Sequence, residues 1–187
     1  MCPLPTASSG RLPARSSCVV KAMAARGLDP LPDYVPPAEF VTGLDGGDGL
    51  APLVLITGAA HHFVTTSMAN QPGLVAKEGT PFIEIHPDDA AARGVRDGED
   101  VIVANERGSC VLRAVVTADV RPGVAVSPKG RWGSLSPDGR SVNWLTPDAV
   151  ADLAGQSTFH SNLVHVRPAE AGRAAPIVAP EMTAVAD

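Results

Sequence analysis

Apolar residues fall in short runs along the chain, and glycine or proline separates most of these runs. Residues 52–57 (PLVLIT) form a continuous apolar run that ends at Gly58, as expected for a strand buried on both faces. Residues 101–104 are predicted to form another strand, and an Arg107-Gly108 turn joins it to the alternating residues 110–117 in the manner of a β-hairpin. The pattern therefore predicts short strands connected by tight turns.

Two short helices are predicted between the strands. Pro87 suits a first helical position, the acidic residues Asp88 and Asp89 follow in the first turn, and Gly94 ends the segment. Residues 146–155 carry similar signals, with Thr-Pro-Asp at the start and glycine at the end. Further short strands are predicted at residues 82–85, 124–127 and 163–166.

These elements favour a mainly β protein that closes into a barrel. A doubly wound sheet would need a helix after nearly every strand, and such helices are missing from the pattern. Residues 1–49 lack sustained periodicity and are predicted to be a poorly ordered tail and linker. Residues 169–187 are rich in alanine and proline and are predicted to be a flexible C-terminal tail. The barrel domain is therefore expected at residues 50–168.

Composition narrows the class of protein. Hydrophobic residues make up 44% of the chain but aromatic residues only 4%, so the core must be aliphatic. A net charge of -5 with only 15 scattered basic residues argues against a nucleic-acid-binding surface. The cysteines at positions 2, 18 and 110 form no C-x-x-C pair, which argues against a disulfide framework or a sulfur-ligated metal and favours the cytoplasm. No apolar run approaches the ~18 residues of a membrane span.

The most unusual polar segment is the loop of residues 57–71, which follows the first predicted strand. It combines small residues with two imidazoles and several hydroxyl groups. Backbone N–H groups of Gly58, Ala59 and Ala60 would approach a pyrophosphate closely, and the hydroxyl and imidazole groups would donate further hydrogen bonds. From composition alone the loop is either an anion-binding site or an ordinary polar surface loop.

Two catalytic interpretations of the same residues find little support. His61 and His62 are adjacent in the sequence, and adjacent residues rarely converge on one zinc ion. A Ser-His-Asp hydrolase would need a nucleophile on a structure such as the G-x-S-x-G elbow, and this motif is absent.

Three later segments also carry candidate binding residues. Residues 129–133 (KGRWG) are either a contact for phosphate or a base, or a charged turn with the tryptophan packed beneath it. Asn143 lies between apolar residues and is expected to be partly buried, so its amide must find hydrogen-bond partners. Residues 156–162 form a polar turn with one aromatic residue ahead of the last strand.

In this order the segments resemble the molybdopterin-dinucleotide-binding domain that closes the polypeptide of dimethyl sulfoxide reductase family enzymes, such as formate dehydrogenases and nitrate reductases. The resemblance is carried by residues 53–63 (LVLITGAAHHF), by residues 81–132, and by residues 142–159 (VNWLTPDAVADLAGQSTF). It implies a double-psi β-barrel of the aspartate decarboxylase-like type with short helices, and a molybdopterin guanine dinucleotide cofactor.

The resemblance also assigns binding roles to individual residues. Thr57 and Gly58 would hold the cofactor through the turn after the strand. Four further residues of the loop would line its phosphates or pterin: His62, Thr65, Thr66 and Ser67. Asn143 would be the cofactor-contacting amide of the family. Residues of the last loop would approach the same cofactor: Gln156, Phe159 and Asn162. Ala59 departs from the family pattern, because many relatives carry arginine after Thr-Gly.

The resemblance implies a binding module and no catalytic residue of its own. The cofactor would carry molybdenum or tungsten, whose protein ligand would come from other domains, and an iron–sulfur cluster is not expected in this chain. The partners would be the remaining catalytic domains or a large subunit of an oxidoreductase, without which the chain is not expected to be active. The alternative is a stand-alone barrel subunit or accessory binding protein, similar to the small barrel subunit of formylmethanofuran dehydrogenases.

Overall fold

The computed structural model describes residues 19–31, 33, 34, 36, 37, 39, 49–151 and 155–169. The tails predicted at residues 1–49 and 169–187 lie largely outside the described residues, which leave out 1–18, 40–48 and 170–187 among others. The chain divides into two units, Met1–Val35 and Pro36–Asp187. The first unit contains the short helix α1 (Lys21–Ala24), which the sequence pattern did not predict.

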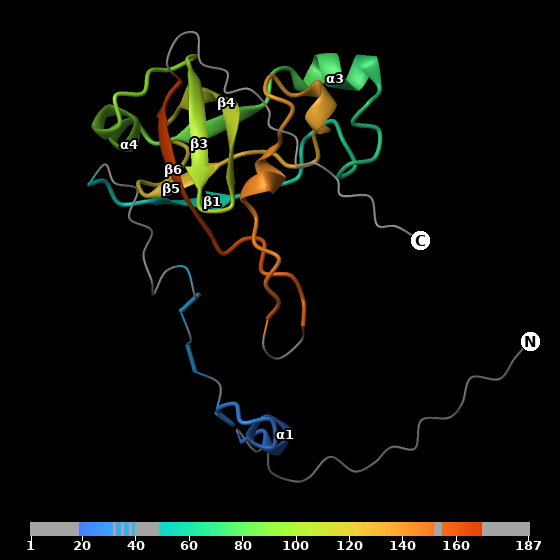
Figure 1. The fold of residues 1–187 in the computed structure, drawn as a ribbon, viewed down its shortest axis with the longest axis vertical. Coiled ribbons are helices and arrows are strands. Elements are labelled where there is room, and N and C mark those ends of the chain that lie inside the picture. Colours follow the sequence, from blue (N-terminus) through green and yellow to red (C-terminus); the bar gives the residue numbers. More distant parts are fainter. Residues whose placement is uncertain are drawn as a thin grey trace, which may run out of the picture. The chain divides into compact units, whose positions relative to one another are not determined.

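Six strands of the second unit form a closed barrel in the order β1-β5-β2-β4-β3-β6 (Figure 1). The strands are β1 (Leu53–Ile56), β2 (Phe82–Ile85), β3 (Asp100–Asn105), β4 (Gly108–Val116), β5 (Val124–Val126) and β6 (Asn162–Pro168). The pairs β1/β5 and β2/β4 are parallel, and the remaining neighbours are antiparallel. The predicted mainly β fold with a closed barrel is confirmed.

The core lies inside the barrel because every second residue of a strand points inward. Fully buried aliphatic side chains alternate along the strands: Leu53, Leu55, Ile83, Ile85, Val101, Val103, Val164 and Val166. The expectation that residues 52–57 are buried on both faces is wrong, since Ile56 is 41% exposed. A barrel strand has one inner and one outer face, and the loops leave the outer face of β1 partly open.

The β3–β4 hairpin forms where the sequence predicted it. The Asn105 side-chain oxygen accepts hydrogen bonds from the backbone N–H groups of Arg107 (3.0 Å) and Gly108 (3.3 Å), which closes the turn. The same side chain donates to the Leu145 carbonyl oxygen at 2.8 Å. One asparagine therefore fixes the hairpin turn and also ties a distant loop to it.

The short helices α3 and α4 lie on opposite sides of the barrel (Figure 1). The predicted helix at Pro87 is confirmed as α4 (Pro87–Ala92), and Asp89 connects it to the barrel by accepting a hydrogen bond from the Gly123 N–H (2.6 Å). The helix α3 (Pro72–Glu78) was not predicted, although Pro72 and Gly79 mark its two ends. Two 3₁₀ helices follow, η1 (Gly133–Leu135) and η2 (Val142–Leu145).

The helix predicted over residues 146–155 is wrong in the part that the structure describes. Thr146 precedes a proline and is extended (φ -81, ψ 141), which is the conformation that a following proline imposes. Val150 forms a β-bridge with Ser157, and the Ala151 N–H donates to the Gln156 carbonyl oxygen at 2.8 Å. Residues 152–154 lie outside the described residues, and the segments flanking them pair as a hairpin.

None of the helices in the described part of the chain combines the length and the apolar character needed to cross a membrane. This applies to α1, α3 and α4 alike, the longest of which, α3, has 7 residues.

Cys110 lies on β4 and is 1% exposed. Burial, and to a lesser extent the charge of Asp138, raise the pKa of the thiol to about 12 from 9.0, against the opposing charge of Arg140. The raised pKa means that the neutral thiol stabilises the folded state. This contribution is fully present below the thiol pKa of the unfolded chain and is lost as the pH rises through the thiol pKa of the folded chain.

We expect the free energy of unfolding to fall more steeply with pH above the unfolded thiol pKa in the wild type than in Cys110→Ala. Denaturant titrations across alkaline pH measure this difference. Parallel pH profiles for the two proteins would contradict the burial of a neutral thiol.

Candidate functional site

A cavity among the described residues, here named the main cavity, has a volume of about 300 Å³ and is formed by four segments of the chain. Its lining residues come from the loop after β1, the segment after β5, the end of η2, and the turn before β6: Thr57, Thr65, Thr66, Lys129, Gly130, Asn143, Thr146 and Phe159. The predicted site residues Thr57, Thr65, Thr66, Asn143 and Phe159 are thus brought together on one cavity.

The pairing of β1 with β5 explains why the first two segments meet. Parallel neighbours end at the same edge of a sheet, and Ile56 is directly opposite Val126. The pairing continues beyond the strands, because the Lys129 N–H donates to the Gly58 carbonyl oxygen at 2.9 Å and Ala59 bridges Lys129 in parallel. The loops that follow the two strands therefore form adjacent walls of the cavity.

Thr57 places a buried hydroxyl group on the cavity wall. The residue is 1% exposed, and its side-chain oxygen has no hydrogen-bond partner among the described residues. A buried polar group without a partner costs about 1–3 kcal/mol of stability. Thr57 lines the cavity, and its buried hydroxyl without a partner makes it a candidate ligand contact.

Thr65 and Thr66 reach the cavity from a tight turn of residues 64–67, here named the Thr65 turn. The N–H groups of Val64 and Ser67 donate to each other's carbonyl oxygens at 3.1 and 2.9 Å. Thr65, the first central residue of the turn, has φ 53, a conformation that glycine usually provides at this position. A β-branched residue in this conformation is strained and persists only where its surroundings hold it.

Helix α3 supports the loop from the side. Ala60, Phe63 and Ala69 of the loop are buried in a small apolar cluster with Leu74 and Val75 of α3. This cluster fixes the base of the loop, while Thr65 and Thr66 remain exposed above it.

Glu78 at the end of α3 makes polar contacts to the same loop. Its carboxylate accepts hydrogen bonds from the His62 backbone N–H (2.9 Å) and contacts the His62 ring nitrogen Nδ1 (2.8 Å). Burial raises the pKa of Glu78, but hydrogen bonds from His62 and His61 and the charge of His62 outweigh it, so the net pKa is lowered. His62 therefore lies against α3, and it is not among the residues that line the main cavity.

Four other predicted site residues, Gly58, Ser67, Gln156 and Asn162, also lie outside the cavity lining. Asn162 is fully buried on β6, and its amide nitrogen donates to the Phe159 carbonyl oxygen at 2.8 Å. It thereby fixes the turn that carries Phe159 to the cavity.

Asn143 lines the cavity but is exposed, so the expectation of partial burial is wrong. The η2 helix buries Val142 and Leu145 at its two ends, at 2% and 0% exposure. The two residues between them, Asn143 and Trp144, consequently face outward. The Asn143 amide is available to a ligand at the cavity rim.

Lys129, Gly130 and Thr146 line the cavity although they were not predicted as site residues, and the role of residues 129–133 was open. Lys129 carries the one charge among the described residues that line the cavity, and its Nζ atom lies 4.3 Å from the Phe159 ring centroid. Trp132 is 44% exposed and donates its indole N–H to the Thr66 carbonyl oxygen at 3.0 Å. The tryptophan is therefore not packed beneath a turn, and it contacts the first loop directly.

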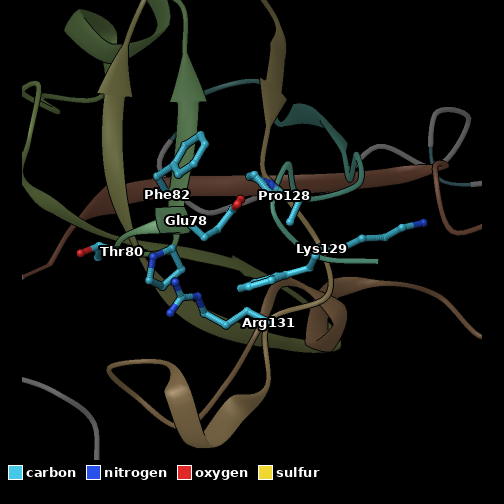
Figure 2. Close-up of a pocket in the computed structure, with 9 residues that line it drawn as sticks. Glu78, Thr80, Phe82, Pro128, Lys129 and Arg131 are labelled. Carbon is cyan, nitrogen blue, oxygen red and sulfur yellow. The ribbon is translucent and has the colours of Figure 1, made fainter. Parts of the chain in front are cut away.

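A smaller pocket of about 20 Å³ shares Lys129 with the main cavity, and its other lining residues include Glu78, Phe82, Pro128 and Arg131 (Figure 2). Arg131 spans it and donates to the carbonyl oxygens of Gly79 and Leu135. In Figure 2 the Lys129 side chain extends away from the other labelled residues. The pocket holds at most a water molecule, so its residues support the wall that carries Lys129.

The barrel and the cavity match a known family. The family described as "Molydopterin dinucleotide binding domain" matches residues 53–163, which include all the described residues that line the main cavity. The chain belongs to the molybdopterin dinucleotide-binding domain family. This confirms the family and the molybdopterin guanine dinucleotide cofactor predicted from the sequence.

Curated relatives are much longer than this chain. "Probable oxidoreductase YoaE" of Bacillus subtilis (strain 168) is 34% identical over 160 residues, 84% of this chain and 22% of that protein. "Biotin sulfoxide reductase" of Cereibacter sphaeroides is 35% identical over 155 residues, 78% of this chain and 20% of that protein. The chain thus spans about a fifth of the length of these two relatives, which contain further domains.

A solved structure shares the fold. Acetylene hydratase from Pelobacter acetylenicus matches with a TM-score of 0.60 and 20% sequence identity, over 79% of this chain and 22% of that chain. At this identity the likeness concerns the fold, and it confirms the predicted double-psi β-barrel.

The carboxylate of Glu78 provides a test of the loop anchor. Because its folded pKa is lowered, the ionised group contributes stability that is present above the unfolded pKa and is lost as the pH falls through the folded pKa. We expect Glu78→Gln to lose about 1–3 kcal/mol near neutral pH, and this difference from the wild type to shrink in acid.

Thermal and denaturant unfolding across pH measure the effect. Glu106→Gln is the matched control, because the Glu106 side chain is 67% exposed and its ion pair with Arg107 is long (3.6 Å). Equal losses in the two variants would exclude a specific anchoring role for Glu78.

Proposed function

We propose that the main cavity holds the nucleotide end of the molybdopterin guanine dinucleotide. The observation that carries the proposal is the buried Thr57 hydroxyl, which lacks a partner among the described residues and lies on a cavity that also contains Lys129. Ligand pockets usually measure about 300–1,000 Å³, so a cavity of about 300 Å³ suits one end of a dinucleotide. The other end of the cofactor extends toward the remaining domains of the oxidoreductase.

The diphosphate is assigned to the wall formed by the loops after β1 and β5. Thr57, Thr65 and Thr66 offer hydroxyl donors, and Lys129 offers a mobile cation to the phosphate charge. Lys129 supplies positive charge next to Ala59, where many family members carry arginine. The long lysine side chain resting on Phe159 can reach a phosphate without a change in the backbone.

The guanine base is assigned to the part of the cavity formed by Asn143 and Phe159. Asn143 presents an amide with both donors and an acceptor, which matches the mixed edge of a guanine base. Phe159 offers an aromatic face for stacking, and Asn162 holds the backbone of this turn. Five more residues remain predicted cofactor contacts from the family resemblance: Gly58, His62, Ser67, Gln156 and Asn162.

The domain acts as part of a molybdenum or tungsten oxidoreductase, with the barrel at residues 50–168. When bound, the cofactor supplies a metal that changes oxidation state, and the residues described here bind and orient it. The remaining catalytic domains or a large subunit complete the site and provide the metal ligand.

Glu39 precedes the barrel and attaches the chain to it. Its carboxylate pairs with Arg107 at 2.7 Å and accepts a hydrogen bond from the Leu163 N–H at 2.8 Å, so the chain around Glu39 is fixed near β6.

Affinity purification of the full chain from its host tests the function. We expect it to recover a catalytic partner together with a guanine nucleotide released by acid, and molybdenum or tungsten by elemental analysis. Recovery of the partner with neither nucleotide nor metal would overturn the proposal.

Thr57→Val tests the central contact, because valine keeps the shape of threonine and removes the hydroxyl. Replacing a buried hydroxyl that lacks a partner is neutral or stabilising for the ligand-free chain, whereas the loss of a ligand hydrogen bond of about 1 kcal/mol weakens binding several-fold. We therefore expect an unchanged or higher melting temperature and a weaker affinity for guanosine diphosphate by calorimetric titration.

Thr117→Val is the matched control, since the Thr117 hydroxyl donates to Asp119 (2.9 Å) on the surface, remote from the cavity lining. Its affinity for guanosine diphosphate should equal that of the wild type. A Thr57→Val protein that binds as well as this control would exclude the hydroxyl as a ligand contact.

A further inference from the structure

Gly130 lies at the closest approach between two walls of the main cavity. It is buried and has φ +103, a region that residues with a side chain rarely adopt. A Cβ atom at this position would lie 2.8 Å from the Thr65 carbonyl carbon and still closer to the carbonyl oxygen. These are backbone atoms, so no rotation of a side chain relieves the overlap. The position requires glycine for its conformation and also for its space.

The contact at Gly130 is the middle one of three between residues 129–132, here named the strap, and the loop after β1. On one side, the Lys129 N–H donates to the Gly58 carbonyl oxygen at 2.9 Å. On the other side, the Trp132 indole N–H donates to the Thr66 carbonyl oxygen at 3.0 Å. The strap therefore holds the loop before, at and after the point where Thr65 takes its strained conformation.

Strain at Thr65 makes this support necessary. Its φ of 53 would be relieved if the turn relaxed, and relaxation would move the two threonine side chains that line the cavity. Met68 has a similar φ of 65 but does not line the cavity. The strap contacts Thr65, which is both the strained residue of the loop and a residue of the cavity lining.

We propose that Gly130 is a positioning residue, which lets the strap close on the Thr65 turn and so holds the Thr65 and Thr66 hydroxyls toward the diphosphate. Gly130 contributes no side chain to the ligand. It acts through the absence of a side chain, because this absence allows the two backbones to touch. The inference rests on the proposed nucleotide-binding function of the cavity.

The test compares Gly130→Ala with Gly123→Ala in the full chain. Gly123 has φ +81, and no atom lies within 4 Å of the position that a Cβ atom would occupy there, so its alanine variant carries the conformational penalty without the overlap. Calorimetric titration with guanosine diphosphate should give an affinity about tenfold weaker in Gly130→Ala. Gly123→Ala should bind as tightly as the wild type.

A second readout separates positioning from a loss of stability. The exchange of the Trp132 indole proton with solvent, followed by NMR, reports whether the strap still contacts Thr66. We expect faster exchange in Gly130→Ala and an unchanged rate in Gly123→Ala. If Gly130→Ala does not fold, Trp132→Phe removes the neighbouring hydrogen bond and should weaken the affinity several-fold.

The outcomes distinguish the two proposals. A wild-type chain that does not bind guanosine diphosphate would contradict the assignment of the cavity to the nucleotide end. A wild-type chain that binds it, together with Gly130→Ala or Trp132→Phe variants of unchanged affinity, would overturn the positioning role alone.

Discussion

The parallel pairing of β1 with β5 is the constraint on which the site depends. The two strands are separated by most of the barrel sequence, yet their register places Ile56 beside Val126 and brings both carboxyl ends to one edge. The backbone pairing then continues into the loops, where Lys129 bonds to Gly58. One wall of the main cavity is thus formed by main chain that the barrel strands hold in place, and side chains of the two loops complete this wall.

Local patterns in the sequence predicted the parts of the fold that depend on local forces. The alternation of apolar residues located the strands, and Pro87 with its acidic first turn located α4. The helix expected at residues 146–155 is wrong in the described part of this range, because Pro147 and the bridge between Val150 and Ser157 favour an extended path. Helix α3 was missed since its stability comes from packing against Phe63 and Ala69, which lie in a loop without regular structure.

Some residues of the candidate site were predicted from the sequence, and others were missed for a physical reason. Thr57 and Phe159 stood in segments whose composition or family resemblance drew attention, and the fold brings both to the cavity. Lys129 and Gly130 belong to the site only because β5 pairs with β1, which no local pattern reveals. The contact of His62 with Glu78 was not predicted, because Glu78 lies on a helix that the sequence pattern did not reveal.

The backbone contact between Gly130 and Thr65 also bears on how this domain can be recombined with its relatives. Two loops that touch through main-chain atoms have complementary shapes, and neither can be replaced without the other. Residues 57–70 and 128–133 therefore form a single module for grafting, although 57 residues separate them along the chain. A chimera that exchanges one loop alone would join loops of mismatched shape, whereas exchanging both would transfer the whole cavity wall that these loops form.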